Sequence, residues 1–173
     1  IMNMVGDTLE MIIKKYSAVS DSPEEWDWSA LREHITAVFG ELPEDAFDFS
    51  EHELDHMTVE SLKDDFIETV NEKYADKEND FAEASGDADA MRNIERIILL
   101  RVVDQKWMDH IDNMEQLRQG INLRAYAQRD PVIEYKFEAM DMFEEMIGSI
   151  KEDTVKLLFH VVPQTRIQRE QVA

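Results

Sequence analysis

The sequence predicts an all-α fold, and two observations carry that prediction. Its 173 residues include only five glycines and four prolines, too few for the many turns of an all-β domain. Apolar residues recur at three- to four-residue intervals in several long segments, which is the spacing of one helix face. The longest segment runs for about 30 positions between Asp89 and Gly120 with no proline or glycine inside it. We therefore expect a mostly helical chain that contains a long antiparallel helical hairpin.

The first expected element is a helix within residues 1–19. Leu9, Ile13 and Tyr16 lie at helical spacing, and the turn-forming residues 20–23 (Ser-Asp-Ser-Pro) follow them. The amphipathic pattern is already under way at the first residue. We therefore expect this helix to be the end of a longer one, and the chain to be part of a longer protein.

Residues 20–87 are expected to form a small acidic helical subdomain. Short apolar patches alternate here with turn residues such as Gly40 and Pro43, which predicts three or so short helices. Residues 1–88 carry 6 basic and 24 acidic side chains (6 − 24 = −18), whereas residues 89–173 carry 12 and 15 (12 − 15 = −3). The favoured explanation for this negative charge is a solvated surface, and the alternative is a partner that recognises the charge electrostatically.

Two long helices should form the hairpin. The first covers the segment from Asp89 to a break over residues 119–130, with an expected length of about 45 Å at 1.5 Å per residue. Asp130 is a good N-cap, and Pro131 suits the first helical position of the second helix, whose apolar stripe runs to Pro163. Long helices joined by a short connection pack antiparallel, so the hairpin should have an exposed tip.

One face of the first hairpin helix carries the residues expected to pack the scaffold. These residues are Trp107, Ile111, Met114 and Leu117, which keep three- to four-residue spacing. We expect Trp107 to be buried, either against the second helix or against a scaffold partner.

Composition excludes several classes of function. The net charge of −21 and a pI near 4.4 argue against binding to nucleic acid or to an anionic membrane surface. The chain has no cysteine for disulfides, thiol chemistry or zinc ribbons, and its glycines are too isolated for a phosphate-binding loop. No apolar run reaches the length of a membrane span, so we expect a soluble chain.

A short motif in the acidic part raises one enzymatic alternative. His52-Glu53-Leu54-Asp55-His56 spells H-E-x-x-H, in which two histidines one helical turn apart bind zinc and the glutamate activates water. A catalytic site also needs a third ligand, for which the nearby carboxylates of Glu72 and Asp76 are available. Five residues match by chance in an acidic chain, so two exposed histidines without a metal are favoured over a zinc hydrolase.

The expected tip of the hairpin has an unusual composition. Residues 117–131 read LRQGINLRAYAQRDP, which combines cations, apolar residues and one tyrosine. From Arg118 to Lys136 there are four basic and two acidic residues (4 − 2 = +2), in a chain of net charge −21. Either this segment contacts a partner, or it is a tethered turn in which Ile121 and Leu123 fold back onto the hairpin.

The same residues carry a resemblance to a known family. The pattern W-x-x-H-x-x-x-M-x-x-L-R-Q-G-I-x-L-R-x-Y-A-Q-x-D-P-x-x-E-Y is filled at every defined position from Trp107 to Tyr135. It resembles the C-terminal helical region of SecA, the ATPase motor that drives preproteins through the bacterial Sec translocon. The resemblance implies four parts: the end of the long scaffold helix (1–19), the helical wing domain (20–87), the two-helix finger of the helical scaffold domain (88–162) and a C-terminal extension (163–173).

The resemblance also implies a working site at the tip. In the family, the fingertip enters the cytoplasmic mouth of the SecY-type channel and touches the unfolded preprotein. By this correspondence Tyr126 is the fingertip tyrosine, whose ring can contact many sequences while its hydroxyl stays hydrated. The other loop residues implied in this contact are Arg124, Ala125, Ala127, Gln128 and Arg129.

Partners and location follow from the resemblance as well. The scaffold helices of the family pack against the motor domains and restrain ATP hydrolysis, so the motor domains of the same protein are implied partners. ATP and magnesium belong to those domains, and this chain is expected to hold no cofactor or metal and to be no enzyme by itself. The implied location is the cytoplasm, peripheral to the inner face of the bacterial plasma membrane.

Some residues depart from the family pattern, and one further alternative stays open. Asn122 stands where many relatives have histidine, and residues 163–173 match no pattern of the family. The alternative is a helical adaptor or interaction module unrelated to secretion.

Overall fold

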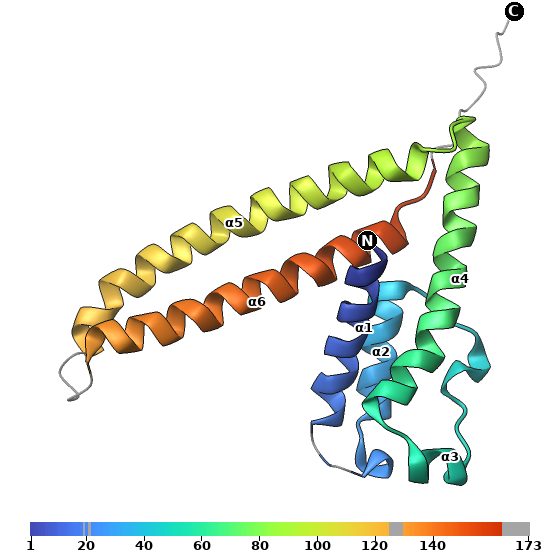
Figure 1. Ribbon diagram of the computed structural model, residues 1–173, viewed down its shortest axis with the longest axis horizontal. Coiled ribbons are helices and arrows are strands. Elements are labelled where there is room, and N and C mark those ends of the chain that lie inside the picture. The colour runs from blue at the N-terminus through green and yellow to red at the C-terminus, as the bar shows by residue number, and fades with distance from the viewer. Residues whose placement is uncertain (19, 21, 125–129, 164–173) are drawn as a thin grey trace, which may run out of the picture.

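The computed structural model describes residues 1–18, 20, 22–124 and 130–163, and within these residues the fold is all-α, as predicted. A hairpin of two long helices extends from a bundle of the remaining helices, and its two arms run antiparallel (Figure 1). The elements in chain order are α1 (Met2–Ser17), the 3₁₀ turn η1 (Pro23–Glu25), α2 (Trp28–Phe39), the 3₁₀ turn η2 (Glu44–Phe47), α3 (Glu51–His56), α4 (Val59–Ser85), α5 (Ala90–Arg124) and α6 (Pro131–His160).

Local sequence explains where most of these helices begin and end. The Asp130 carboxylate accepts a hydrogen bond from the Val132 amide at 2.9 Å, which confirms the predicted start of α6 with Pro131 in its first turn. Thr58 caps α4 in the same way through the Ser61 amide. Gly86 ends α4 in the left-handed conformation (φ +71°), which a residue without a Cβ adopts at little cost.

The prediction of only short helices in residues 20–87 is wrong, because α4 alone has 27 residues. Its buried side chains recur on one face at intervals of four and seven residues: Leu62, Phe66, Val70, Tyr74 and Phe81. The charged residues between them occupy the solvent face and do not interrupt the helix.

The predicted break of the first hairpin helix over residues 119–130 is also wrong in its first half. α5 continues through Gly120 and ends at Arg124, which gives it 35 residues. A glycine inside a helix costs only about 1 kcal/mol, and Ile121, directly after it, is buried. A Cβ at Gly120 would meet no atom within 4 Å, so packing does not require a glycine there.

A single hydrophobic core joins the bundle to the base of the hairpin. It combines side chains of α1, α2 and α4 with Met91 near the start of α5 and Leu158 and Phe159 near the end of α6. The Phe159 ring lies 5.2 Å from the Phe39 ring and 5.4 Å from the Tyr74 ring. The buried core therefore crosses the expected boundaries between scaffold and wing.

Polar contacts reinforce this junction between α4 and the hairpin. The Tyr74 hydroxyl donates to the Glu95 carboxylate of α5 at 2.6 Å, and burial raises the pKa of Tyr74, which keeps the hydroxyl a donor. Arg92 of α5 pairs with Glu78 of α4. The Lys77 ammonium of α4 donates to the backbone carbonyl that follows α6. These contacts hold α4 against both arms of the hairpin at its base.

A histidine of α2 connects three helices that are distant in sequence. His34 Nδ1 lies 3.1 Å from the Tyr16 hydroxyl of α1, and its Nε2 lies 3.0 Å from the Glu152 carboxylate of α6. The imidazole is largely shielded from solvent, so both ring nitrogens have protein partners in a place where water has little access. This bridge fixes α6 against α1 and α2.

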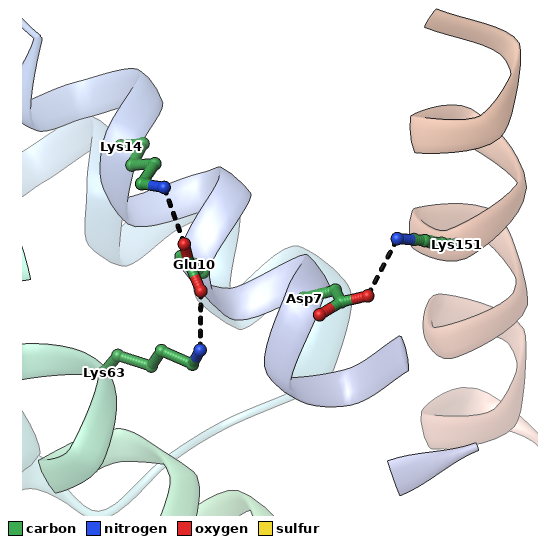
Figure 2. A network of polar contacts seen from close by, with 5 residues as sticks. All are labelled: Asp7, Glu10, Lys14, Lys63 and Lys151. Carbon is green, nitrogen blue, oxygen red and sulfur yellow. Dashed lines mark hydrogen bonds and ion pairs between the residues drawn. The ribbon is translucent and has the colours of Figure 1, made fainter. Parts of the chain in front are cut away.

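Two groups of ion pairs tie α1 to its neighbours (Figure 2). Glu10 accepts from Lys14 and from Lys63 of α4, both at 2.6 Å, and Asp7 accepts from Lys151 of α6 at 2.8 Å. Hydrogen bonds from Lys14 and then Lys63 lower the pKa of Glu10 from 4.5 to about 2. A depressed carboxyl pKa stabilises the fold above pH 4.5, and that stabilisation is lost as the pH falls from about 4.5 to 2.

Replacing Glu10 with glutamine should therefore lower the urea midpoint of unfolding at pH 7. The difference from the wild-type chain should shrink as the pH falls from 4.5 toward 2, because the wild-type carboxylate becomes protonated over that range. Urea titrations at several pH values measure the effect, and Glu24→Gln, at an exposed glutamate outside the network, is the control. A difference that stays constant with pH would contradict this account.

Candidate functional site

The candidate site is the hairpin of α5 and α6. Val102, Met146 and Ile150 form a small apolar cluster between the two arms. Lys106 of α5 pairs with Asp153 of α6 at 2.6 Å. The contacts between the arms and the core at their base hold α5 and α6 together, and the far ends of the two helices lie away from the bundle (Figure 1).

The predicted fingertip lies between the end of α5 and the start of α6. Arg124, expected in the loop, is instead the last residue of α5. Ala125, Tyr126, Ala127, Gln128 and Arg129 fall outside the residues that the structure describes. The structure thus gives the two helix ends that bracket these five residues, and Asp130 fixes the start of the returning helix.

The last turns of α5 show how the positive charge near the tip is balanced. Arg118 pairs with Glu115 at 2.7 Å, and Gln119 donates to the same carboxylate at 2.9 Å. Hydrogen bonds from Gln119 and Arg118 lower the pKa of Glu115, and the Glu115 carboxylate raises the pKa of Arg118. Arg118 is therefore paired within its own helix.

One side of the hairpin is apolar and exposed to solvent. Five large apolar residues of α5 fall within about 100° of each other around the helix, and five of α6 within about 120°. We call these ten residues the apolar face: Ile97, Leu100, Trp107, Met108, Ile111, Ile133, Phe137, Met140, Phe143 and Ile147. Large exposed apolar residues gathered on one side of a folded protein are typical of an interaction site.

A row of rings shows that the two stripes meet on the same side of the hairpin. The Trp107 ring of α5 lies 5.9 Å from the His110 ring, which in turn lies 6.0 Å from the Phe143 ring of α6. The apolar face therefore spans both arms.

The predicted scaffold-packing residues divide between this face and the seam of the hairpin. Trp107 is 49% exposed and Ile111 is 52% exposed, so the prediction that Trp107 is buried against the second helix is wrong. The Trp107 side chain lies on the apolar face because residue 107 is on the side of α5 that is turned away from α6. Met114 and Leu117 are half-buried, and Leu117 lines a shallow hollow with Met142 of α6.

The H-E-x-x-H segment forms the short helix α3, where its glutamate has a structural role. Glu53 accepts from the Ser50 amide at 2.7 Å and from the Ser50 hydroxyl at 2.6 Å, which completes a capping box. His52 and His56 are exposed, with ring centroids 5.0 Å apart. Within the described ranges, no group of three or more histidine, aspartate or glutamate side chains is arranged to hold a metal ion.

The hairpin and bundle match a known family along almost their whole length. The SecA wing and scaffold domain family matches residues 1–162. This chain belongs to that family. It is similar to protein translocase subunit SecA 1 of Alkaliphilus metalliredigens, with 44% identity over 100% of this chain and 18% of the relative. It is also similar to protein translocase subunit SecA of Acetivibrio thermocellus, with 38% identity over 100% of this chain and 18% of the relative.

Other relatives agree with this assignment. Protein translocase subunit SecA of Pelotomaculum thermopropionicum is 42% identical over 98% of this chain and 18% of the relative. The chain thus spans about a fifth of the length of the SecA proteins that it matches. Among its described residues, no helix is both long and apolar enough to cross a membrane.

In this SecA scaffold, sequence reasoning did not identify the residues that hold the hairpin in place. Glu152 lies 118 positions from His34, and Val161 lies 84 positions from Lys77. Such pairs leave no local pattern, and a lone histidine in an amphipathic helix reads as a surface residue. One signal in the sequence could have suggested that His34 lies near the core: apolar residues such as Leu31 and Ile35 of α2 stand on either side of it.

Exposure of Trp107 in the SecA scaffold leads to a stability prediction. Trp107→Ala should change the free energy of unfolding of this chain by less than about 1 kcal/mol, because half of the side chain is already in solvent. Ile150→Ala, at a buried position of the same hairpin, should cost about 2–5 kcal/mol. Thermal unfolding of both variants is the measurement. Equal losses in the two variants would mean that Trp107 belongs to the packed core.

Proposed function

We infer that this chain is the mechanical and regulatory part of a SecA-type motor for protein export. The observation that carries the inference is a hairpin of two packed helices with exposed apolar residues in a chain of the SecA wing and scaffold family. The motor would hydrolyse ATP with magnesium in domains outside this sequence. The chain itself supplies a lever and a docking surface, with no catalytic residue.

The tip of the lever is proposed to touch the preprotein and the cytoplasmic mouth of a SecY-type channel. A motor that moves arbitrary sequences must hold them without reading them, and an aromatic ring suits this because it packs on many side chains. Tyr126 is the proposed contact, with Arg124 and Arg129 beside it as cations. Ala125, Ala127 and Gln128 complete the loop.

The apolar face is proposed to dock on the motor domains of the same protein. Trp107 and Phe137 expose large rings there, on opposite arms, and a folded protein rarely leaves such surface in water. Docking of the motor domains on a stiff hairpin would couple the tip to the nucleotide site, which is how the scaffold would restrain ATP hydrolysis. The proposed location of the motor is therefore the cytoplasm, at the inner face of the plasma membrane through the channel.

The family match rules out the expected alternative of an adaptor unrelated to secretion, and a binding experiment tests whether the motor domains dock on the apolar face. The separately purified motor domains of the parent protein are passed over the immobilised chain, and retention is measured. The wild-type chain should retain them, and the double variant Trp107→Ser/Phe137→Ser should lose most of the retention. The control variant Glu33→Gln/Glu83→Gln changes exposed residues away from the hairpin arms and should behave like wild type. No retention by the wild-type chain would contradict docking of the motor domains on the apolar face.

A further inference from the structure

A second surface, away from the hairpin, is a groove between η2, α3 and α4. Its floor is apolar: Phe66 is buried, and Phe49 and Met57 are half-buried. Asp45 and Asp65, both exposed, also line the groove and add carboxylates to its edge. The groove therefore combines an apolar floor with a negative edge.

The floor is held in place before any ligand arrives. The Phe66 ring packs on the Phe47 ring at 4.9 Å, and the Phe49 ring packs on the Trp28 ring at 5.3 Å. The Trp28 indole in turn donates to the Pro23 carbonyl at 2.9 Å. A preformed apolar floor lets a ligand bind without first ordering the protein.

Among the described residues that line the groove, none is a lysine or an arginine, and the nearby Arg32 guanidinium lies over the Phe47 ring at 5.1 Å. Asp45, Asp48, Glu53 and Asp65 line the groove, and among the other lining residues only His52 and His56 can carry positive charge. The hydrogen bonds from Ser50 lower the pKa of Glu53, so its carboxylate stays charged at neutral pH. The chain around the groove adds to the field, since residues 1–88 have a net charge of −18 (6 − 24).

We propose that this groove binds a short polypeptide segment in which an apolar side chain is flanked by lysine or arginine. The apolar side chain would lie on Phe49, Met57 and Phe66, and the flanking cations would lie within reach of Asp45 and Asp65. Nucleic acid is repelled by the negative rim, and no described cluster is arranged for a metal. Charge complementarity and the apolar floor together select a basic amphipathic peptide.

The test uses the full chain and a fluorescently labelled ten-residue peptide with two leucines flanked by lysines. Binding is followed by anisotropy at low and at moderate salt. The wild-type chain should bind the peptide, and more weakly at the higher salt, because exposed ion pairs are screened. The same peptide with glutamate in place of lysine should not bind. No binding of the lysine peptide at low salt would overturn the proposal.

Matched variants separate the groove from the general negative charge of the chain. The variant Asp45→Asn/Asp48→Asn/Asp65→Asn should weaken binding by about tenfold, because it neutralises the rim. Three exposed glutamates that do not line the groove give a control with the same change in net charge: Glu33→Gln/Glu60→Gln/Glu83→Gln.

The control variant should change binding by less than about twofold. Equal weakening by both triple variants would mean that the peptide is attracted by the net charge of the chain and not by the groove, and would overturn the proposal.

Met57→Ser tests the floor and should weaken binding of the lysine peptide without lowering the thermal midpoint by more than a few degrees. Unchanged binding by Met57→Ser would show that the apolar floor is not used, and would also overturn the proposal.

Discussion

Replacing Tyr126 with alanine in the full-length parent protein should lower preprotein translocation by about tenfold and leave basal ATP hydrolysis within about twofold of wild type. Tenfold corresponds to about 1.4 kcal/mol, which is the size of one aromatic contact. The ATPase should be spared because Tyr126 lies in the five-residue segment between α5 and α6, far along the chain from the core that holds the base of the hairpin. Translocation of a labelled preprotein into membrane vesicles and phosphate release are the two measurements.

Two comparisons make this result specific to the ring. Tyr126→Phe keeps the aromatic surface and should keep most of the translocation activity. Tyr135→Phe, in the second turn of α6, changes another tyrosine of the same hairpin and should be neutral. Parallel losses of translocation and ATP hydrolysis in Tyr126→Ala would indicate a folding defect or a docking role instead.

Replacing Phe159 with alanine should destabilise the whole chain by about 3–5 kcal/mol. Phe159 is 5% exposed and lies between the rings of Phe39 and Tyr74, so its removal leaves a cavity where α2, α4 and α6 meet. For a chain of this size the thermal midpoint should fall by roughly 10 °C. Because one core joins bundle and hairpin base, circular dichroism and near-ultraviolet probes should report a single transition at the lower temperature.

Phe137→Ala is the matched control for Phe159→Ala. It removes the same side chain from the same helix, but Phe137 is 69% exposed, so the thermal midpoint should change by at most a few degrees. Two separate transitions in the Phe159→Ala chain would contradict the shared core and favour independent folding of the wing.

Helix type and helix starts could be read from the sequence because local chemistry decides them. Asp130 followed by Pro131 specifies the start of α6 by a cap and a fixed φ angle, and both appear in the structure. Helix ends were harder to predict. Gly120 looks like a terminator, yet the helix continues because its cost of about 1 kcal/mol is small beside the packing of the hairpin. The sequence predicted short helices where α4 is one helix of 27 residues, because the dense charges on its solvent face separate the apolar residues into short patches.

The candidate site was only partly predictable for a similar reason. Apolar spacing predicted the hairpin, the resemblance of residues 107–135 to SecA indicated its family, and the family match over residues 1–162 agrees with both. Periodicity indicated that Trp107 and Ile111 lie on an apolar stripe, but it did not indicate whether that stripe is buried. A helix that is apolar on two sides shows the same spacing whether one side or both sides are buried. The structure separates the two sides: Val102 is buried between the arms, and Trp107 is exposed.

The contacts at the hairpin base join the acidic region to both arms. Tyr74 and Lys77 of α4 contact α5 and the segment after α6, and His34 of α2 contacts α6. The acidic region is therefore packed against the hairpin as well as against α1.

The central claim is that the tip of the hairpin works on the preprotein, and one cross-linking measurement tests it most directly. The chain contains no cysteine, so a single cysteine at position 126 of a full-length parent made cysteine-free elsewhere reports on that position alone. A preprotein is stalled in the channel, and adducts are identified by mass. The account predicts adducts to the preprotein or to the channel. Adducts at control cysteines in the motor domains, with none at position 126, would contradict it and leave the hairpin a scaffold alone.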